Sequence, residues 1–156
     1  MKEQTAILPK LPIVGSLKLT SYDGKRLASI EVTSSHEKPS SKSLDPFFKH
    51  CYVEFKNFLE GNTRIISIPV DYSRLTPFQQ DVLKAMKKIP YGEKKSYKDL
   101  AQMMGSKAYQ ATGSACGKNP FLLIYPCHRV VGSQGPGGFA HGLEMKKKLW
   151  VLEKSY

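Results

Sequence analysis

The sequence predicts a mixed α/β (α+β) protein with a small N-terminal α/β domain and a mostly helical C-terminal domain. Two observations predict the first domain: β-rich runs flank an Asp-Gly hairpin signal, and aromatic residues recur at helical spacing between Phe47 and Leu59. A third observation marks its end, because the aromatic, β-rich sequence changes around residues 71–76 to a helical pattern dotted with lysines. We therefore predict domains at residues 1–72 and 73–156.

In the first domain, the short runs on either side of Asp23-Gly24 predict two antiparallel strands. The aromatic segment predicts a helix that ends before Gly61, because glycine accommodates the left-handed residue that often follows a helix. Pro69, near the end of the last β-rich run, lacks a backbone N–H and indicates an edge strand. The predicted elements are strands at residues 13–20 and 26–33, a loop at 34–43, a helix from 47 to 59 and a strand at 65–70.

The second domain is predicted to begin and end with a helix. The segment 76–79 supplies a threonine N-cap, a proline at the first helical position and a capping-box glutamine. The last helix, predicted at residues 143–155, carries Leu149, Trp150 and Leu152 on its inner face and the lysines 146–148 on its outer face.

Between these helices the sequence predicts a helix-turn-helix, with helices at residues 96–104 and 107–117 joined by a turn at Gly105. The second of these helices is rich in alanine, glycine and serine, so it can approach another surface closely. Tight packing inside the core is one explanation and contact with a DNA backbone is another. We favour DNA, because Lys107 and Lys118 flank the helix.

The distribution of charge also indicates a polyanionic partner. The formal net charge is +11 at pH 7. Residues 1–72 hold ten basic and eight acidic side chains, whereas residues 73–156 hold fourteen basic and five acidic ones. A basic second half favours nucleic acid, because each phosphate contact releases counterions. A generic basic surface would explain the charge equally well.

Three cysteines occur, at positions 51, 116 and 127, without the spacing of a disulfide framework or a zinc site. Cys51 lies on the apolar face of the aromatic helix and is predicted to be a core residue, and Cys116 is assigned no role beyond packing. His36 and His50 lack partners at metal-like spacing, so they are predicted to be structural or solvated. We expect neither a metal nor a cofactor.

The third cysteine has the sequence context of a nucleophile. Residues 121–125 form an apolar run that predicts a buried strand, and Pro126 then delivers Cys127 at its end. A buried cysteine is most often only a small hydrophobic residue. His128 and Arg129 change that expectation, because an imidazole and a guanidinium close to a thiol favour the reactive thiolate.

The segment around Cys127 resembles the acceptor-site signature of O6-alkylguanine-DNA alkyltransferases, and the resemblance covers about the second half of the chain. It implies an RNase H-like N-terminal domain and a C-terminal domain with a helix-turn-helix and an acceptor cysteine on a strand. The matching segments are Tyr91-Gly92-Glu93, Ser96-Tyr97-Lys98-Asp99-Leu100-Ala101, Asn119-Pro120, Pro126-Cys127-His128-Arg129-Val130 and Gly137 to Gly142.

The resemblance implies roles for five residues. Cys127 is the alkyl acceptor, His128 acts on its thiol through a water molecule, and Glu153 pairs with the histidine. Glu153 lies within an apolar helix stripe, where an unpaired carboxylate would be costly, so a histidine partner is also physically reasonable. Tyr97 is the phenol that assists the leaving guanine, and Asn119 is the hinge between the recognition helix and the acceptor segment.

The resemblance further implies a base pocket and a DNA interface. Backbone groups at Cys127, Val130 and Ala140 would read the flipped base by its edge. The predicted pocket residues are Tyr97, Val130, Phe139, Ala140 and His141. The predicted DNA-binding residues are Lys107, Ala108, Gln110, Ala111, Thr112, Ser114, Lys118 and Arg129, with bracing of the fold an equal alternative for Arg129.

Two positions depart from the family pattern. Gln110 stands where members commonly carry an arginine that fills the space of the flipped nucleotide. Phe139 and Ala140 stand where the loop usually offers a tyrosine and a serine, and His141 follows them. These changes remove side-chain hydrogen bonds from the loop but leave its backbone contacts.

We therefore expect a DNA-repair methyltransferase that flips O6-alkylguanine, and also O4-methylthymine, out of duplex DNA and transfers the alkyl group irreversibly to Cys127. One alternative is a sensor that binds alkylated bases without transfer, which the cysteine argues against. Another is a papain-like cysteine hydrolase, which the helix-turn-helix and the charge argue against. We expect a monomer without a membrane partner, located in the cytoplasm, or in the nucleus of a eukaryote.

Overall fold

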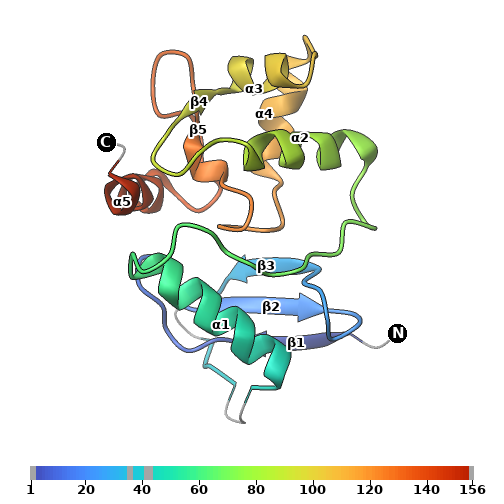
Figure 1. Ribbon diagram of the computed structural model, residues 1–156, viewed down its shortest axis with the longest axis vertical. Helices are drawn as coiled ribbons and strands as arrows, with labels where there is room; N and C mark the ends of the chain where they lie inside the picture. Colours follow the sequence, from blue (N-terminus) through green and yellow to red (C-terminus); the bar gives the residue numbers. More distant parts are fainter. Residues whose placement is uncertain (1–2, 35–36, 41–43, 155–156) are drawn as a thin grey trace. The chain divides into compact units, whose positions relative to one another are not determined.

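The computed structural model describes residues 3–34, 37–40 and 44–154 of the 156-residue chain (Figure 1). The chain divides into two compact units, Met1–Tyr72 and Ser73–Tyr156, and each is described by itself. Helices and short strands occur together along the chain, so the predicted mixed α/β (α+β) class is confirmed. The RNase H-like character expected of the N-terminal domain stays a prediction.

The N-terminal unit contains a three-stranded antiparallel sheet in the order β1-β2-β3. Its strands are β1 (Gln4–Ile7), β2 (Leu17–Ser21) and β3 (Ser29–Val32). The predicted antiparallel pairing of the second and third strands is confirmed, and β1 has no counterpart among the predicted elements. Leu17 and Leu19 of β2 are completely buried on one face of the sheet, because alternate side chains along a strand share a face.

The connection from β2 to β3 is longer than a two-residue hairpin at Asp23-Gly24. Regular pairing ends at the Thr20–Ser29 pair, and eight residues of the connection lie between these two. Within the connection, Asp23 Oδ1 accepts a hydrogen bond of 2.8 Å from the backbone N–H of Lys25. The aspartate side chain therefore replaces ladder hydrogen bonds and holds a wider loop.

The helix α1 (Pro46–Leu59) lies beside this sheet in Figure 1 and confirms the predicted aromatic helix. Asp45 caps it by accepting a 3.0 Å hydrogen bond from the backbone N–H of Phe48. Gly61 follows its end with φ 80°, as the glycine signal predicts. Cys51 is completely buried, and burial raises its pKa to about 12, so its prediction as a core residue is confirmed.

The predicted strand at residues 65–70 is wrong. Only Val70 bridges to another segment, in a parallel bridge with Leu27. The N–H of Leu27 donates to the carbonyl of Pro69 at 2.9 Å, and the N–H of Asp71 donates to the carbonyl of Leu27 at 2.7 Å. Proline has no N–H to extend this ladder, so the segment stays extended without forming a strand.

Of the two histidines in this unit, His50 lies within the described residues. His50 Nε2 lies 3.0 Å from the carbonyl oxygen of Ser67, a contact that fits the structural role expected of it. His36 lies outside the described residues, as do parts of the predicted loop at residues 34–43.

The C-terminal unit is mostly helical, as predicted. Its first helix begins with the predicted capping box: Thr76 Oγ1 accepts from the N–H of Gln79 at 3.1 Å, and Gln79 Oε1 accepts from the N–H of Thr76 at 3.0 Å. The helices are α2 (Pro77–Lys87), α3 (Tyr97–Met103), α4 (Tyr109–Gly117) and α5 (Leu143–Glu153), and Cys127–Arg129 forms a short 3₁₀ helix.

The predicted helix-turn-helix is present in α3 and α4, which pack against each other. Gly105 connects them with φ 68°, a left-handed conformation that favours glycine. Ser96 caps α3 by accepting a 3.0 Å hydrogen bond from the N–H of Asp99. The helix α4 starts two residues later than predicted, so Lys107 lies in the turn that precedes it.

The predicted buried strand at residues 121–125 is wrong, although the burial is confirmed. These residues form a turn in which the N–H of Tyr125 donates to the carbonyl of Phe121 at 3.1 Å. Leu123 adopts φ 74°, which no regular strand contains. A short apolar run has no periodicity that separates a buried strand from a buried turn, so the sequence pattern could not make this distinction.

Cys127 consequently lies on a 3₁₀ turn and not at the end of a strand. The strand that follows, β5 (Val130–Val131), pairs in parallel with β4 (Lys95–Ser96). This small ladder joins the start of α3 to the segment that carries the cysteine. It thereby brings Tyr97, the first residue of α3, close to the same region.

Three residues of the last helix, α5, are buried: Lys146, Leu149 and Glu153. Leu149 is completely buried, as predicted, and Trp150 and Leu152 are half-buried. Lys146 was expected on the outer face but is also completely buried. Its position one turn before Trp150 places it on the side of the helix that faces the protein.

The capping box of α2 predicts a measurable contribution to stability. Replacing Thr76 with alanine removes the side chain that accepts from Gln79, so we expect the free energy of unfolding to fall by about 1 kcal/mol. Thr76→Ser keeps the acceptor and should lie within about 0.5 kcal/mol of the parent protein. Urea denaturation followed by circular dichroism measures both. Equal losses in the two variants would contradict the capping role.

Candidate active site

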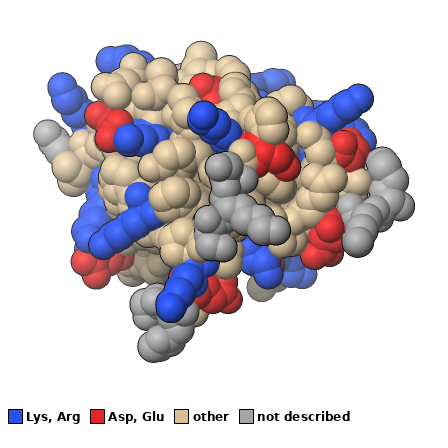
Figure 2. Space-filling model, turned by 90° about the horizontal axis from the view of Figure 1, so that it is seen from below, with Lys and Arg blue, Asp and Glu red and all other residues tan. Residues whose placement is uncertain are grey.

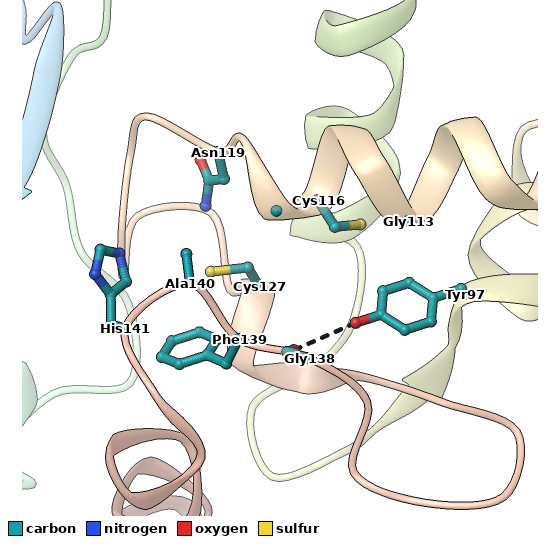
Figure 3. A pocket seen from close by; sticks show the side chains of 10 residues that line it. Tyr97, Gly113, Cys116, Asn119, Cys127, Gly138, Phe139, Ala140 and His141 are labelled. Atoms are coloured by element: carbon teal, nitrogen blue, oxygen red, sulfur yellow. Dashed lines mark hydrogen bonds between the residues drawn. The ribbon is translucent and has the colours of Figure 1, made fainter.

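A pocket in the C-terminal unit surrounds Cys127 (Figure 3). Its volume is about 360 Å³, within the range of about 300 to 1,000 Å³ found for small-ligand sites. In Figure 3, Cys127 lies between Cys116 near the end of α4, with Asn119 just beyond that helix, and the loop that carries Phe139 and Ala140. The pocket is lined by Tyr97, Gly113, Cys116, Gly117, Asn119, Cys127, Gly138, Phe139, Ala140 and His141.

Asn119 fixes the chain that leads to the cysteine. Its Oδ1 accepts from the N–H of Phe121 at 2.9 Å, and its Nδ2 donates to the carbonyl of Tyr125 at 2.9 Å. One amide thus closes both ends of the turn at residues 121–125. Cys127 follows two residues later, partly exposed at the pocket, so Asn119 sets where the thiol stands.

Behind Cys127, a buried carboxylate joins two side chains of the 3₁₀ turn. Glu153 Oε2 lies 2.6 Å from His128 Nε2 and accepts from Arg129 Nη2 at 2.9 Å. Arg129 Nε donates to Glu153 Oε1 at 2.9 Å, and the backbone N–H of Gly92 donates to the same oxygen at 3.1 Å. The predicted pairing of His128 with Glu153 therefore exists, and Arg129 completes it.

These contacts decide the charge states of the cluster. Burial would raise the pKa of Glu153, but hydrogen bonds from His128 and Arg129 outweigh it and lower that pKa to about 2. Burial lowers the pKa of His128, and this effect, with help from the positive charges of Arg129 and Lys146, outweighs the hydrogen bond and charge of Glu153, which raise that pKa. A charged carboxylate beside a neutral imidazole assigns the ring proton to Nε2, which donates to Glu153.

The other ring nitrogen of His128 is then an unprotonated acceptor. Nδ1 is buried and has no hydrogen-bond partner among the described residues. A buried nitrogen lone pair without a donor is unusual in a native protein and calls for a functional explanation. Its position on the residue next to Cys127 suits a base that accepts the thiol proton.

The thiol itself is in a low-polarity environment. Burial raises the pKa of Cys127, whereas a hydrogen bond from Asn119 and the positive charge of Lys146 lower it. The expectation that Arg129 would favour the thiolate needs correction, because its guanidinium is paired with Glu153 and also donates to the carbonyl of Ile89 at 2.8 Å. Lys146 is the cation that acts on the sulfur.

Tyr97 and the glycine-rich loop form the opposite wall of the pocket. The hydroxyl of Tyr97 donates to the carbonyl of Gly138 at 3.3 Å, the dashed contact in Figure 3. Burial raises the pKa of Tyr97, so the phenol keeps its proton at neutral pH. Gly137 has φ 70°, and a Cβ there would lie 2.8 Å from Gly132 N and 3.0 Å from Tyr97 Oη, so only glycine fits.

The structure brings together most of the predicted catalytic and pocket residues. Of the predicted pocket residues, Val130 alone does not line the cavity, because it is completely buried in β5. His128 and Glu153 lie behind the cysteine and not in the cavity wall. The residues that do line the pocket as predicted are Tyr97, Asn119, Cys127, Phe139, Ala140 and His141.

The predicted DNA-binding residues separate into exposed and buried ones. The exposed ones are Lys107, Ala108, Gln110, Ala111, Ser114 and Lys118. Thr112 is completely buried and its hydroxyl donates to the carbonyl of Ala108 at 2.8 Å, while Arg129 is buried in its contact with Glu153. We therefore withdraw Thr112 and Arg129 from the DNA interface, and Arg129 takes the alternative role of bracing the fold.

The surface carries charged side chains of both signs. On the face shown in Figure 2, lysine and arginine side chains are interspersed with acidic ones.

Sequence reasoning missed several residues of the site. Gly113, Gly117 and Cys116 line the pocket from α4, and their spacing of three and four residues places them along one side of that helix. This pattern could have been recognised once one of them was assigned to a pocket. Lys146 gave no such signal, because it stands in a run of three lysines that is typical of a solvated surface.

The part of the chain that the structure describes contains neither a membrane-spanning helix nor a cluster of metal ligands. No helix in residues 3–34, 37–40 or 44–154 is long and apolar enough to cross a membrane. Over the same ranges, no group of three or more histidine, cysteine, aspartate or glutamate side chains is arranged to hold a metal ion.

A family model and the sequences of related proteins both assign the chain to one family. Residues 77–155 match the family model of the 6-O-methylguanine DNA methyltransferase DNA binding domain. A probable methylated-DNA–protein-cysteine methyltransferase of Acanthamoeba polyphaga mimivirus is 38% identical over 144 residues, covering 90% of this chain and 89% of the relative. The chain belongs to the O6-methylguanine DNA methyltransferase family.

Solved structures of family members have the same fold. A crystal structure of the Mycobacterium tuberculosis O6-methylguanine methyltransferase matches with a TM-score of 0.82 and 34% identity, covering 99% of this chain and 94% of that one. The M. tuberculosis protein in complex with DNA matches with a TM-score of 0.79 and 32% identity, covering 98% and 92%. The homologues support methyltransferase activity for this family member and DNA as its partner.

The charge of Glu153 predicts both a mutational and a pH effect on stability. Glu153→Gln leaves the buried guanidinium of Arg129 without an anion, so we expect a loss of about 3 to 5 kcal/mol. Because the folded pKa of about 2 lies below the ordinary value of 4.5, the ionised carboxylate stabilises the folded state above pH 4.5, and this contribution disappears as the pH falls towards 2. The variant should lack that pH dependence.

A matched control lies on the same helix. Glu144 has a side chain that is 86% exposed and pairs only with Lys148, so Glu144→Gln should change stability by less than about 1 kcal/mol. Chemical denaturation between pH 2.5 and 7 compares the two variants with the parent. A Glu153→Gln protein as stable as Glu144→Gln would show that the buried carboxylate is not holding Arg129.

Proposed function

We propose that this chain removes the alkyl group from O6-alkylguanine in duplex DNA and transfers it irreversibly to Sγ of Cys127. The observation that carries the proposal is the unpartnered Nδ1 of buried His128, on the residue next to a thiol that faces a base-sized pocket. Glu153 holds the other nitrogen of the ring, so the imidazole is oriented and its free nitrogen is basic.

The reaction is a displacement at a saturated carbon. The thiol proton moves to Nδ1 of His128 through one water molecule, and the sulfur electron pair forms a bond to the alkyl carbon. The bond between that carbon and O6 breaks, and its electron pair goes to the guanine. His128 gives up the proton it received, so in total the hydrogen of the thiol is replaced by the alkyl group and guanine regains a hydrogen.

The leaving guanine requires a proton donor. Tyr97 suits this role because its phenol is protonated at neutral pH and its hydroxyl lies at the pocket, where it donates to Gly138 in the free protein. The donor would turn from that carbonyl to the departing base. Asn119 contributes by holding the turn before Cys127, and backbone groups near Ala140 would read the edge of the flipped base.

DNA would approach along the exposed face of α4. Small side chains there allow close contact with a phosphate backbone, and Lys107 and Lys118 lie exposed at the two ends of the helix. The buried side of the same helix supplies Cys116 to the pocket. One helix therefore offers its outer face to the duplex and its inner face to the extruded base.

The two alternatives are less well supported. A sensor that binds alkylated nucleobases without transfer needs no nucleophile. The pocket, however, contains the thiol of Cys127, and the next residue, His128, is oriented by Glu153. A cysteine hydrolase would use the same thiol and base, but the helix-turn-helix of α3 and α4 and the family to which the chain belongs argue against it. We propose further that the protein acts as a monomer on O6-methylguanine and O4-methylthymine, without a cofactor, in the compartment that contains the DNA.

Stoichiometric transfer gives a direct test. After incubation with excess O6-methylguanine duplex, the protein should gain one methyl group, on Cys127 alone, and then stop reacting. Cys127→Ser should gain none, because its hydroxyl is a far weaker nucleophile, while DNA affinity should remain because phosphate contacts lie elsewhere. Intact mass and peptide mapping measure this, with Cys51→Ala as the control that keeps transfer. Product formation beyond one equivalent contradicts the proposal.

The exposed position of Gln110 gives a second test. An uncharged glutamine should fill the space left by a flipped nucleotide less firmly than arginine does. It also neutralises no phosphate, so it releases no counterion from the DNA. We expect Gln110→Arg to tighten duplex binding, steepen its salt dependence and speed transfer from duplex DNA, with little effect on the free modified base. Single-turnover rates on both substrates measure the difference.

A control for added charge is Val151→Arg on α5, whose side chain is 59% exposed. It should leave the ratio of duplex rate to free-base rate unchanged. If Gln110→Arg also leaves this ratio unchanged, Gln110 does not occupy the space of the flipped nucleotide.

A further inference from the structure

Lys146 is a completely buried lysine for which the proposed reaction has given no role. Lysine is almost never fully buried without a partner, because transferring an ammonium group out of water is costly. Its neighbours Lys147 and Lys148 are exposed, so the sequence offers no general reason for a buried charge in this helix. A buried charge retained at a cost to stability commonly serves a functional site.

The ammonium group of Lys146 is held by the loop that forms one wall of the pocket. Nζ donates to the carbonyl of Pro136 at 2.7 Å and to the carbonyl of Gly138 at 3.0 Å. It also lies 5.8 Å from the ring centre of Phe139 and 5.9 Å from that of Trp150, within reach of a cation–π attraction. Lys146 therefore fixes the backbone immediately before the pocket residues of the loop.

The ionisable groups that face Lys146 include no carboxylate. Among the described residues, no acidic side chain forms a salt bridge with Nζ, and Glu153 on the same helix is paired with His128 and Arg129. The groups close enough to interact with its charge are the thiols of Cys127 and Cys116, the imidazole of His128 and the ammonium of Lys94. An ionised Cys127 is the anion that this arrangement best accommodates.

We propose that Lys146 is a positioning residue that acts in two ways: it clamps the loop at residues 136–138 against α5, and it supplies the positive charge that stabilises the Cys127 thiolate during attack. This inference rests on the proposed function of Cys127. Under this inference, the negative charge on the sulfur is stabilised by Lys146, which does not line the pocket, while His128 remains the base. Lys146 stays protonated throughout, so the atoms of the transfer balance as before.

The proposal implies a pH limit. Burial and, to a smaller extent, the charge of Lys94 lower the pKa of Lys146 to about 8, against the opposite effect of the thiols of Cys127 and Cys116. The charge is therefore present at neutral pH and is lost as the pH rises above about 8. Because the folded pKa lies below the ordinary value of 10.5, carrying the charge costs stability below pH 8, and this cost disappears towards pH 10.5.

The test separates charge from support of the loop. Lys146→Met removes both, Lys146→Gln keeps a donor to the carbonyls without charge, and Lys146→Arg keeps the charge. Lys147→Met, next along the helix and exposed, is the matched control. For each protein, the rate at which iodoacetamide modifies Cys127 is followed by peptide mass from pH 6 to 10, alongside melting temperature and single-turnover transfer from O6-methylguanine duplex.

We expect Lys146→Met and Lys146→Gln to shift the pH profile of Cys127 upward by about one unit, which lowers its rate at pH 7 about tenfold. Lys146→Arg should keep the parent profile, and so should Lys147→Met. The melting temperature of Lys146→Gln should not fall below that of the parent, because a costly buried charge is removed while a donor to the loop carbonyls is kept. Lys146→Met also leaves the carbonyl of Pro136 without its hydrogen bond, so it should melt below Lys146→Gln.

Other outcomes overturn the inference. A parent-like pH profile in Lys146→Met and Lys146→Gln would show that the charge does not act on the thiol. A rate loss that is equal at every pH and accompanied by a lower melting temperature would make Lys146 purely structural. Iodoacetamide reports on the thiol without DNA, so a shifted profile in a protein that fails to demethylate DNA would reject the proposed function and leave the role of Lys146 intact.

Discussion

The buried carboxylate of Glu153 is the interaction on which the site depends. It is the last residue of α5, and it accepts hydrogen bonds from His128 and Arg129 of the 3₁₀ turn and from the backbone of Gly92. Three segments far apart in the sequence therefore meet at one anion. Without it, Arg129 would be a buried charge without a partner and His128 would have nothing to set its orientation.

Arg129 and His128, which are neighbours in the sequence, have different roles in this arrangement. Arg129 forms an ion pair with Glu153 and donates a hydrogen bond to the carbonyl of Ile89, so its charge stabilises the fold and not the thiolate. His128 stays neutral and keeps one nitrogen free beside the cysteine. Positive charge near the sulfur comes instead from Lys146, which approaches from behind the loop. The base and the charge thus reach Cys127 from different elements.

Local signals in the sequence predicted the parts of the fold that local chemistry determines. The capping box at Thr76 and the glycine turn at Gly105 were predicted because each depends on a few adjacent residues. The pairing of His128 with Glu153 was predicted from the family resemblance and from the cost of an unpaired carboxylate in an apolar stripe. The acceptor segment, in contrast, was predicted as a strand, because a five-residue apolar run does not distinguish a strand from a turn with Leu123 at positive φ.

The other wrong predictions concern the direction in which the side chains of Lys146 and Thr112 point. Lys146 stands among three lysines and yet points inward, and Thr112 stands on a helix with an exposed face and yet is buried. Both depend on how a helix is rotated about its axis, which tertiary packing decides. Arg129 was open between DNA and the fold, because the sequence does not show that Glu153 has room for two partners.

The central claim is that burial keeps His128 neutral and Glu153 holds the ring proton on Nε2, so that Nδ1 is the base for Cys127. Nitrogen NMR of protein labelled at the histidine rings tests this most directly. At pH 7 the account predicts a His128 signal with Nε2 protonated and Nδ1 unprotonated, and Glu153→Gln should alter it while Glu144→Gln should not. A protonated Nδ1 at pH 7, in either the charged ring or the other tautomer, would contradict the account.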